Sequence, residues 1–224
     1  LFIERSDVPT IWQKAKVCDW ARKSLIRIRK SADEWLHKNV EFPTTTGRHP
    51  WVYVCPDCNE ALQTLSETQH QCPKCKKIYT GLPYDAVLLR SKHMALARAA
   101  SNLGLAAVLF DRPEYAEKAL NILLGYAERY SSYPLLDVGG GQGASAARIM
   151  DQTLNEAIWL IDIVWAYDLI LGVGVGTEAE YRKIENQLIR PSIATISKCK
   201  AGKSNWQSWH NGALACAAIV LKDE

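Results

Sequence analysis

The sequence has no long apolar run and no strong excess of either charge. Its longest apolar stretches, such as residues 103–110, fall well short of the ~18–20 residues that a membrane-spanning helix needs, so we expect no membrane span. The 27 Lys and Arg are interspersed with 24 Asp and Glu, which gives a net charge of only +3. One basic cluster lies between residues 22 and 30. We interpret it as the solvated face of an early helix, and we expect no nucleic-acid partner.

The chain also lacks an initiating Met and a signal peptide. It opens at Leu1, and at its other end the charged residues 222–224 interrupt an apolar helical run without a cap. We therefore expect these residues to be part of a longer protein, from which a leader could have been removed. With 224 residues, 48% of them hydrophobic, the chain can bury one substantial core, and one or two domains are expected.

Phenylalanine is scarce. Three Phe stand beside eight Trp and nine Tyr. Indole and phenol rings suit surfaces that are apolar on one side and hydrogen-bonded on the other, as sugar-binding clefts are. Ordinary core filling is the alternative for most of these rings.

A glycine-rich segment lacks the context of a phosphate-binding loop. Gly139, Gly140, Gly141 and Gly143 lie within residues 133–147, but no predicted strand precedes them and no Gly-Lys-Ser/Thr follows. We predict a flexible loop near a cleft.

The clearest functional signal in the sequence is a set of four cysteines. Cys55 and Cys58 form one Cys-x-x-Cys pair, and Cys72 and Cys75 form another after thirteen intervening residues. Two such turns complete a tetrahedral thiolate site for Zn²⁺, with no open position for a substrate. We predict a structural zinc that stabilises a segment too short for its own core; two disulfides or unpaired buried thiols are the alternatives.

Most of the remaining sequence has helical periodicity. Residues 8–37 predict one or two helices, and the pattern from residue 85 onward is almost wholly helical. Asp111 is a candidate cap before a helix that begins at Pro113, and Thr177 and Ser204 open capping-box patterns for the last two helices. Short returns predict antiparallel hairpins, which could form a bundle, a solenoid or a toroid.

Polar side chains are concentrated at the start of the last helix. Asn205, Gln207, His210 and Asn211 stand beside two indoles in the first two turns. The free N–H groups and positive dipole end of a helix attract carboxylates, and they disfavour a charged imidazole. His210 is therefore predicted to be neutral and able to donate one hydrogen bond. A histidine satisfied in the core is the alternative, since His210 shares a face with Ala213 and Ala217.

Several motifs stand in order along the chain: residues 53–58, 72–75 with 79–85, 116–120 with 124–130, 152–159, 165–168 and 205–211. Together they resemble the N-terminal part of the heparinase II/III-like polysaccharide lyases, which include oligoalginate and glycosaminoglycan lyases. The resemblance implies a mainly α fold: an incomplete (α/α) toroid of antiparallel helical hairpins with a small zinc-ribbon-like β insert. The expected domains are toroid helices in 1–40, the insert in 41–84 and further toroid helices in 85–224, with β-sheet domains beyond the chain.

The resemblance also implies a carbon–oxygen lyase that cleaves uronate polysaccharides, such as alginate or glycosaminoglycans, by β-elimination. A base removes the C5 proton, and donors aimed at the carboxylate stabilise the enediolate that develops. By motif position the predicted catalytic residues are His210, Asn211 and Asn205. The predicted substrate-binding residues are Trp206, Gln207, Trp209, Gln152 and Glu156.

The resemblance further implies a tyrosine and a histidine as acid and base, and neither has a matching position before Glu224. We therefore expect residues 1–224 to hold half of an active site and to form no appreciable unsaturated uronate alone. The partner would be an acidic polysaccharide, and the resemblance favours a periplasmic or secreted location, with a cytoplasmic one left open. The alternative function is a non-catalytic α-helical carbohydrate-binding or scaffold module with a structural zinc ribbon. The oligomeric state is not indicated.

Overall fold

Helices make up most of the computed structural model, which describes residues 3–222. The helices are α1 (Val8–Val17), α2 (Asp19–Leu36), α3 (Tyr84–Phe110), α4 (Pro113–Arg129), α5 (Thr153–Val173), α6 (Glu178–Ile184), α7 (Arg190–Ser197) and α8 (Asn205–Leu221). A small antiparallel sheet in the order β1-β2-β3 contains β1 (Gln63–Ser66), β2 (Gln69–Gln71) and β3 (Ile78–Tyr79). The prediction of a mainly helical fold with a small β insert is confirmed.

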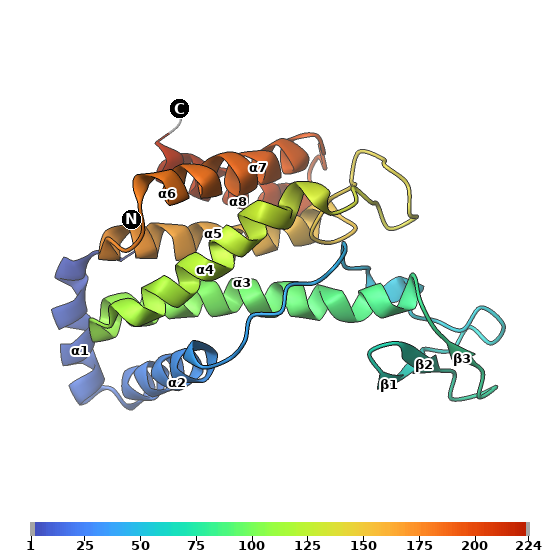
Figure 1. Ribbon diagram of the computed structural model, residues 1–224, viewed down its shortest axis with the longest axis horizontal. Helices are drawn as coiled ribbons and strands as arrows, with labels where there is room; N and C mark the ends of the chain where they lie inside the picture. The colour runs from blue at the N-terminus through green and yellow to red at the C-terminus, as the bar shows by residue number, and fades with distance from the viewer. Residues whose placement is uncertain (1–2, 223–224) are drawn as a thin grey trace.

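The long helices are arranged as hairpins. α3, α5 and α8 run in the same direction, and α4 and the α6–α7 segment run back against them (Figure 1). α3 packs against both α4 and α5, and α5 packs against α8. The N-terminal ends of α3, α5 and α8 therefore lie on the same side of the molecule, which we call the N-terminal edge (right in Figure 1). The antiparallel hairpins match the expectation, and a toroid remains a prediction.

The core between α3, α4 and α5 is built partly from aromatic rings. Trp159 is fully buried, with the ring of Tyr126 edge-on at 5.1 Å and that of Tyr130 stacked at 6.5 Å between centroids. His93 is buried beside them, and its ring nitrogens reach the Tyr126 hydroxyl at 3.0 Å and the Thr45 carbonyl at 3.1 Å. Burial lowers the pKa of His93 to about 4, so this histidine is neutral. Core filling accounts for these rings.

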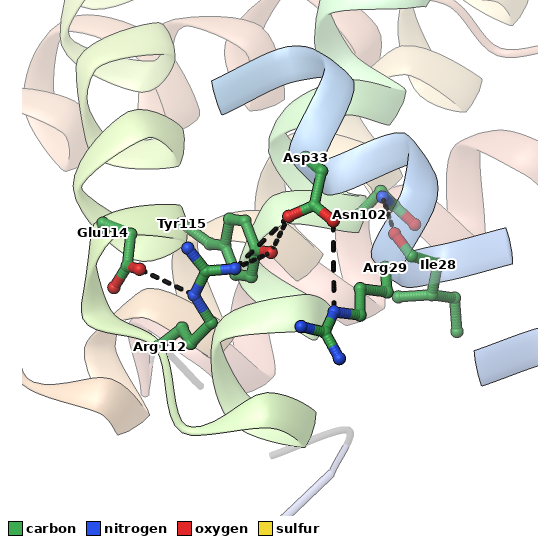
Figure 2. Close-up of polar contacts among 7 residues, drawn as sticks. All are labelled: Ile28, Arg29, Asp33, Asn102, Arg112, Glu114 and Tyr115. Carbon is green, nitrogen blue, oxygen red and sulfur yellow. Dashed lines mark hydrogen bonds and ion pairs between the residues drawn. The ribbon is translucent and has the colours of Figure 1, made fainter. Parts of the chain in front are cut away.

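A polar cluster fastens α2 to α3 and α4 (Figure 2). Asp33 of α2 accepts hydrogen bonds from the Tyr115 hydroxyl and from Arg112, whose Nη1 lies 3.3 Å from Asp33 Oδ1. Arg112 also pairs with Glu114 at 2.6 Å. Asn102 of α3 donates to the Ile28 carbonyl at 3.1 Å, so the polar groups at this helix junction are paired with one another.

The β insert is tied to the first turn of α3. His70 of β2 is fully buried, with Nδ1 2.6 Å from the Tyr53 hydroxyl and Nε2 2.8 Å from Oδ1 of Asp85. Asp85 also accepts from the Gly81 N–H at 3.1 Å. The insert and the start of α3 therefore share one hydrogen-bond network.

The predicted helix starts are partly confirmed. Thr177 and Glu180 form a reciprocal capping box, and the Ser204 hydroxyl accepts from the Gln207 N–H at 3.4 Å. Pro113 begins α4 as predicted. The prediction for Asp111 is wrong: it takes a left-handed conformation (φ 51°) that ends α3, and Arg112 precedes α4.

The helix predicted across residues 177–196 is interrupted by one π-helical turn, Glu185–Ile189. In this turn the Arg190 N–H bonds to the Glu185 carbonyl, one residue farther back than in an α-helix. The following residue, Pro191, has no N–H to bind the Gln187 carbonyl, which explains why the regular pattern fails here.

By length and composition alone, α3 is the helix within residues 3–222 that could cross a membrane. Its 27 residues include an 18-residue window with a mean hydropathy of 1.2, and 56% of that window is buried inside the structure. Core helices of folded domains have the same properties, so the expectation of no membrane span stays a prediction.

Candidate functional site

The four predicted metal ligands lie together. The sulfur atoms of Cys55, Cys58, Cys72 and Cys75 are all within 4.8 Å of one another, and none of these cysteines is in a disulfide. Four converging sulfurs could bind one metal ion, and the tetrahedral thiolate set is the one Zn²⁺ prefers.

Two equivalent turns bring the sulfurs together. The Asn59 N–H bonds to the Cys55 carbonyl at 2.8 Å, and the Lys76 N–H bonds to the Cys72 carbonyl at 3.0 Å. Asn59 and Lys76, each directly after the second cysteine of its pair, both have a positive φ, 51° and 62°. Non-glycine residues rarely adopt this conformation. Its recurrence at matching positions indicates that the two Cys-x-x-Cys turns share one backbone geometry, as the two halves of one metal site would.

The surroundings of Cys55 favour its thiolate. The side chain is fully buried, which raises the pKa of the thiol. This effect is outweighed by hydrogen bonds from the Tyr79 hydroxyl, at 3.1 Å, and from the N–H groups of Cys58 and Asp57, and the pKa of Cys55 falls to about 6. The pKa of Cys58 is raised to about 12, mainly by the hydrogen bond between Cys58 and Cys75 and secondly by burial. At least one sulfur is therefore held in the form that binds metals.

A second group of predicted residues surrounds a hollow at the start of α8. This open hollow of about 460 Å³ is lined by Gly202, Lys203, Ser204, Asn205, Gln207, Ser208 and Asn211. Asn205 and Asn211 are exposed, and the half-buried Gln207 donates to Asn211 Oδ1 at 2.8 Å. Gln207 Oε1 in turn accepts from the Ala201 N–H at 2.9 Å. The Lys203 ammonium, the amide groups and the free N–H groups of the first helical turn all offer donors to an anion.

His210 lies on the same two turns of α8, and it is not among the residues that line this hollow. The residue is 1% exposed, and neither ring nitrogen has a partner at hydrogen-bond geometry. Burial lowers its pKa, and the carbonyls of Cys199 and Thr153 offset only part of this effect, so the ring is neutral at neutral pH. The indole of Trp206, which is half-buried, stands edge-on to the ring at 6.4 Å. The carbonyls of Cys199 and Thr153 are near the ring, although neither reaches hydrogen-bond geometry with a ring nitrogen.

The other predicted substrate-binding residues differ in how far they are buried. Trp209 is 43% exposed on α8. Gln152 is buried directly before α5 and donates to Asn155 Oδ1 at 3.2 Å. Both residues are near the N-terminal edge, because α8 packs on α5 and the Thr153 carbonyl approaches His210.

Glu156 lies in the interior. Its side chain is fully buried and accepts hydrogen bonds from the Tyr130 hydroxyl and from the N–H groups of Arg148 and Ile149, at 2.7 Å and 3.1 Å. All these donors belong to the protein, so the carboxylate fastens α5 to α4 and to the preceding loop. A substrate-binding role for Glu156 stays a prediction.

Two substitutions of Glu156 should distinguish the contribution of these hydrogen bonds to stability from that of the negative charge. Glu156→Ala leaves two buried N–H groups without an acceptor, so we expect the free energy of unfolding to fall by about 3 kcal/mol or more. Glu156→Gln should cost about 1 kcal/mol, because its carbonyl oxygen can still accept from both N–H groups, and Tyr130 can donate to Thr195, 3.1 Å away. Chemical denaturation of the two variants measures the difference; equal losses would contradict this account.

The same carboxyl group should make stability depend on pH. Burial raises the pKa of Glu156 above its ordinary 4.5, although the three hydrogen bonds to its carboxylate oppose this. The folded state then binds the proton more tightly than the unfolded state does. The contribution of this group is fully present below about pH 4.5 and is lost as the pH rises through the raised pKa. Glu156→Gln should lack this component of the stability profile, and an unchanged profile would contradict the raised pKa.

Sequence reasoning missed a buried ion pair beside α5. Arg48 and Asp151 are buried, with Nε 3.3 Å from Oδ2, and Arg48 Nη2 also bonds to the Val138 carbonyl at 2.8 Å. Asp137 accepts from the Gly141 and Gly143 N–H groups at 2.8 Å and 2.9 Å, which orders the glycine-rich loop. Lys203 was also missed, although its position directly before the Ser204 cap was a usable signal.

Two known proteins share part of their sequence with this chain. The chain is 29% identical over 131 residues to an exo-oligoalginate lyase of Saccharophagus degradans, covering 58% of this chain and 17% of that protein. It is also 29% identical over 114 residues to an alginate lyase of Stenotrophomonas maltophilia, covering 49% of this chain and 15% of that protein. No family model matches the chain.

The chain spans about a sixth of the length of these curated relatives. Both relatives are named as lyases, one of oligoalginate and one of alginate. The more specific resemblance to heparinase II/III-like lyases remains a prediction from the sequence motifs.

Proposed function

We propose that this chain is the helical part of a lyase that cleaves uronate polysaccharides by β-elimination, and that the start of α8 binds the uronate carboxylate. The observation that carries the proposal is the donor-lined hollow at the start of α8. Lys203, Asn205 and Asn211 line this hollow at the first turns of α8. Such an arrangement of donors is suited to a carboxylate.

The chemistry explains why these donors matter. In β-elimination, a base takes the C5 proton, the electrons form the C4–C5 double bond, and the bond from C4 to the glycosidic oxygen breaks as that oxygen gains a proton. Negative charge moves onto the carboxylate while the C5 proton is leaving. Donors that strengthen their hydrogen bonds at this moment stabilise the transition state more than the bound substrate.

His210 would be the strongest of these donors. A neutral ring whose nitrogens have no well-formed hydrogen bond can donate one to a carboxylate. His210 is 1% exposed, so neighbouring side chains would have to move to admit the carboxylate. Asn211 and Asn205, already exposed, would hold the same group from the solvent side.

The cysteine site belongs to the same proposal as a structural zinc. Four thiolates fill the tetrahedral positions around zinc, so the metal would hold the insert folded and would take no part in the elimination. The shared network of His70 and Asp85 links this insert to the first turn of α3.

Product chemistry tests the proposal directly. The full-length protein that contains these residues, incubated with alginate, should release oligosaccharides with a C4–C5 double bond, which is followed by ultraviolet absorbance and mass spectrometry. Lys203→Ala should weaken substrate binding, whereas Lys30→Ala, an exposed lysine on α2, should not. Saturated products from alginate would indicate hydrolysis. Binding without any cleavage would favour the non-catalytic carbohydrate-binding module.

A further inference from the structure

A second group of side chains lies on the N-terminal edge, where residues 47–51 run beside α3. The Arg48 N–H bonds to the Ala86 carbonyl at 2.9 Å, and the Gly47 N–H bonds to the Ile149 carbonyl at 3.0 Å. A Cβ on Gly47 would lie 2.8 Å from the Arg90 backbone, so glycine is what allows this close approach. The segment is thereby fixed against both α3 and the start of α5.

His49 is held in one orientation with one nitrogen free. Its backbone N–H donates to Asp151 Oδ2 at 2.9 Å, and its Nδ1 accepts from the Trp51 N–H at 3.3 Å. Burial lowers the pKa of His49, and Arg90 adds to this effect while Asp151 opposes it. The neutral ring must then carry its proton on Nε2, which has no acceptor within residues 3–222.

Trp51 provides an exposed aromatic face beside the His49 ring. The indole is 69% exposed and its ring lies 4.3 Å from that of His49 between centroids, at an interplanar angle of 54°. The residue lies in a short 3₁₀ turn, Pro50–Val52, whose first residue is a proline. An exposed indole on a fixed backbone offers a flat apolar face on which a sugar ring can stack.

Arg90 adds a cation without a partner. It is half-buried, its Nε is buried without a hydrogen bond, and no acidic side chain of the described residues pairs with it. The nearby carboxylate of Asp151 is already used by Arg48 and by the His49 N–H. A partly desolvated guanidinium therefore stands ready for an external anion.

We infer that Trp51, Arg90 and His49 form a second subsite for an acidic sugar unit. The indole would stack on the apolar face of the ring, the guanidinium would bind the carboxylate, and Nε2 of His49 would donate to a hydroxyl. This inference rests on the proposed function, since it places a further uronate unit on the same edge. Asp151, which anchors His49, is two residues from Thr153, whose carbonyl approaches His210, so one polymer could occupy both sites.

The composition of the group favours a sugar over a polyphosphate. A nucleic-acid backbone is bound by several cations in a row, whereas this group has one free cation, one neutral donor and one aromatic face. Uronate polymers carry one carboxylate and one stackable ring face per unit, which matches this set.

Binding of oligosaccharides of graded length tests the subsite. In the full-length protein, Trp51→Ala and Arg90→Gln should each weaken binding of an alginate octasaccharide about ten-fold, measured by calorimetry, because each removes one good contact. Binding of an alginate disaccharide, which needs only the α8 hollow, should not change. The Arg90 effect should shrink at high salt, and the Trp51 effect should not.

Matched controls come from α2, on the other side of the molecule. Trp20→Ala removes an indole that is 62% exposed, and Arg27→Gln removes an exposed guanidinium. Neither should alter octasaccharide binding. Arg90→Lys should retain part of the affinity, and circular dichroism confirms that each variant is folded.

The outcomes separate this inference from the proposed function. If Trp51→Ala and Arg90→Gln bind the octasaccharide as tightly as the unaltered protein while unsaturated product still forms, the subsite is refuted and the lyase proposal stands. If binding weakens as expected but no unsaturated product forms, the lyase proposal fails and the subsite stands as a carbohydrate-binding site. Equal dependence on Arg90 for a neutral oligosaccharide, or for single-stranded DNA, would refute the assignment to an acidic sugar.

Discussion

His210→Ala in the full-length enzyme should lower kcat by about 10²–10³-fold while changing KM little. Removing one donor from a site that stabilises developing negative charge typically costs this much. A loss concentrated in kcat marks an interaction made mainly in the transition state. Steady-state formation of unsaturated product from alginate measures both constants.

Two variants make this result specific. His210→Asn keeps a donor near the same position and should recover part of the lost kcat. His37→Ala, at an exposed histidine after α2, should leave kcat unchanged. If His210→Ala lowers the melting temperature and leaves kcat intact, His210 belongs to the core, and its unpaired nitrogens need another explanation.

The second large effect should come from removing the metal. We expect one zinc per chain by elemental analysis, and we expect Cys55→Ser to abolish it together with the fold of the insert. Structural zinc sites in small domains contribute on the order of 10 kcal/mol to folding, far more than the insert could gain from its few buried residues. Thermal unfolding should therefore show a large loss of stability, and activity should fall as its consequence.

Cys216→Ser is the matched control, because Cys216 is a half-buried free thiol on α8, outside the cysteine cluster. It should keep the zinc and most of the stability. Less than about half an equivalent of zinc, together with Cys55–Cys58 or Cys72–Cys75 disulfides by mass spectrometry, would overturn the prediction.

The parts of the structure that the sequence predicted are those encoded by short spacing. Each Cys-x-x-Cys turn needs only six or so neighbouring residues, and the capping pattern at Thr177 is complete within four. Helical periodicity likewise reports on local geometry. The convergence of the two cysteine pairs could be predicted because a known coordination geometry requires it.

Contacts between distant residues were harder to predict. His49 and Arg90 are far apart in sequence, and only the close approach at Gly47 brings them together. The burial of Glu156 did leave a signal, because α5 has apolar residues around its whole circumference, as helices surrounded by protein do. The motif match predicted a substrate-binding role for the Glu156 carboxylate, whereas the apolar residues around Glu156 indicated a buried position.

The two-residue link between α3 and α4 has a consequence for biosynthesis. Contacts that close short loops form fastest, so this hairpin can form soon after both helices emerge from the ribosome. At a synthesis rate of about 5–20 residues per second, α8 follows several seconds later. The α8 residues proposed to bind the carboxylate would then join a platform of α3, α4 and α5 that has already begun to pack.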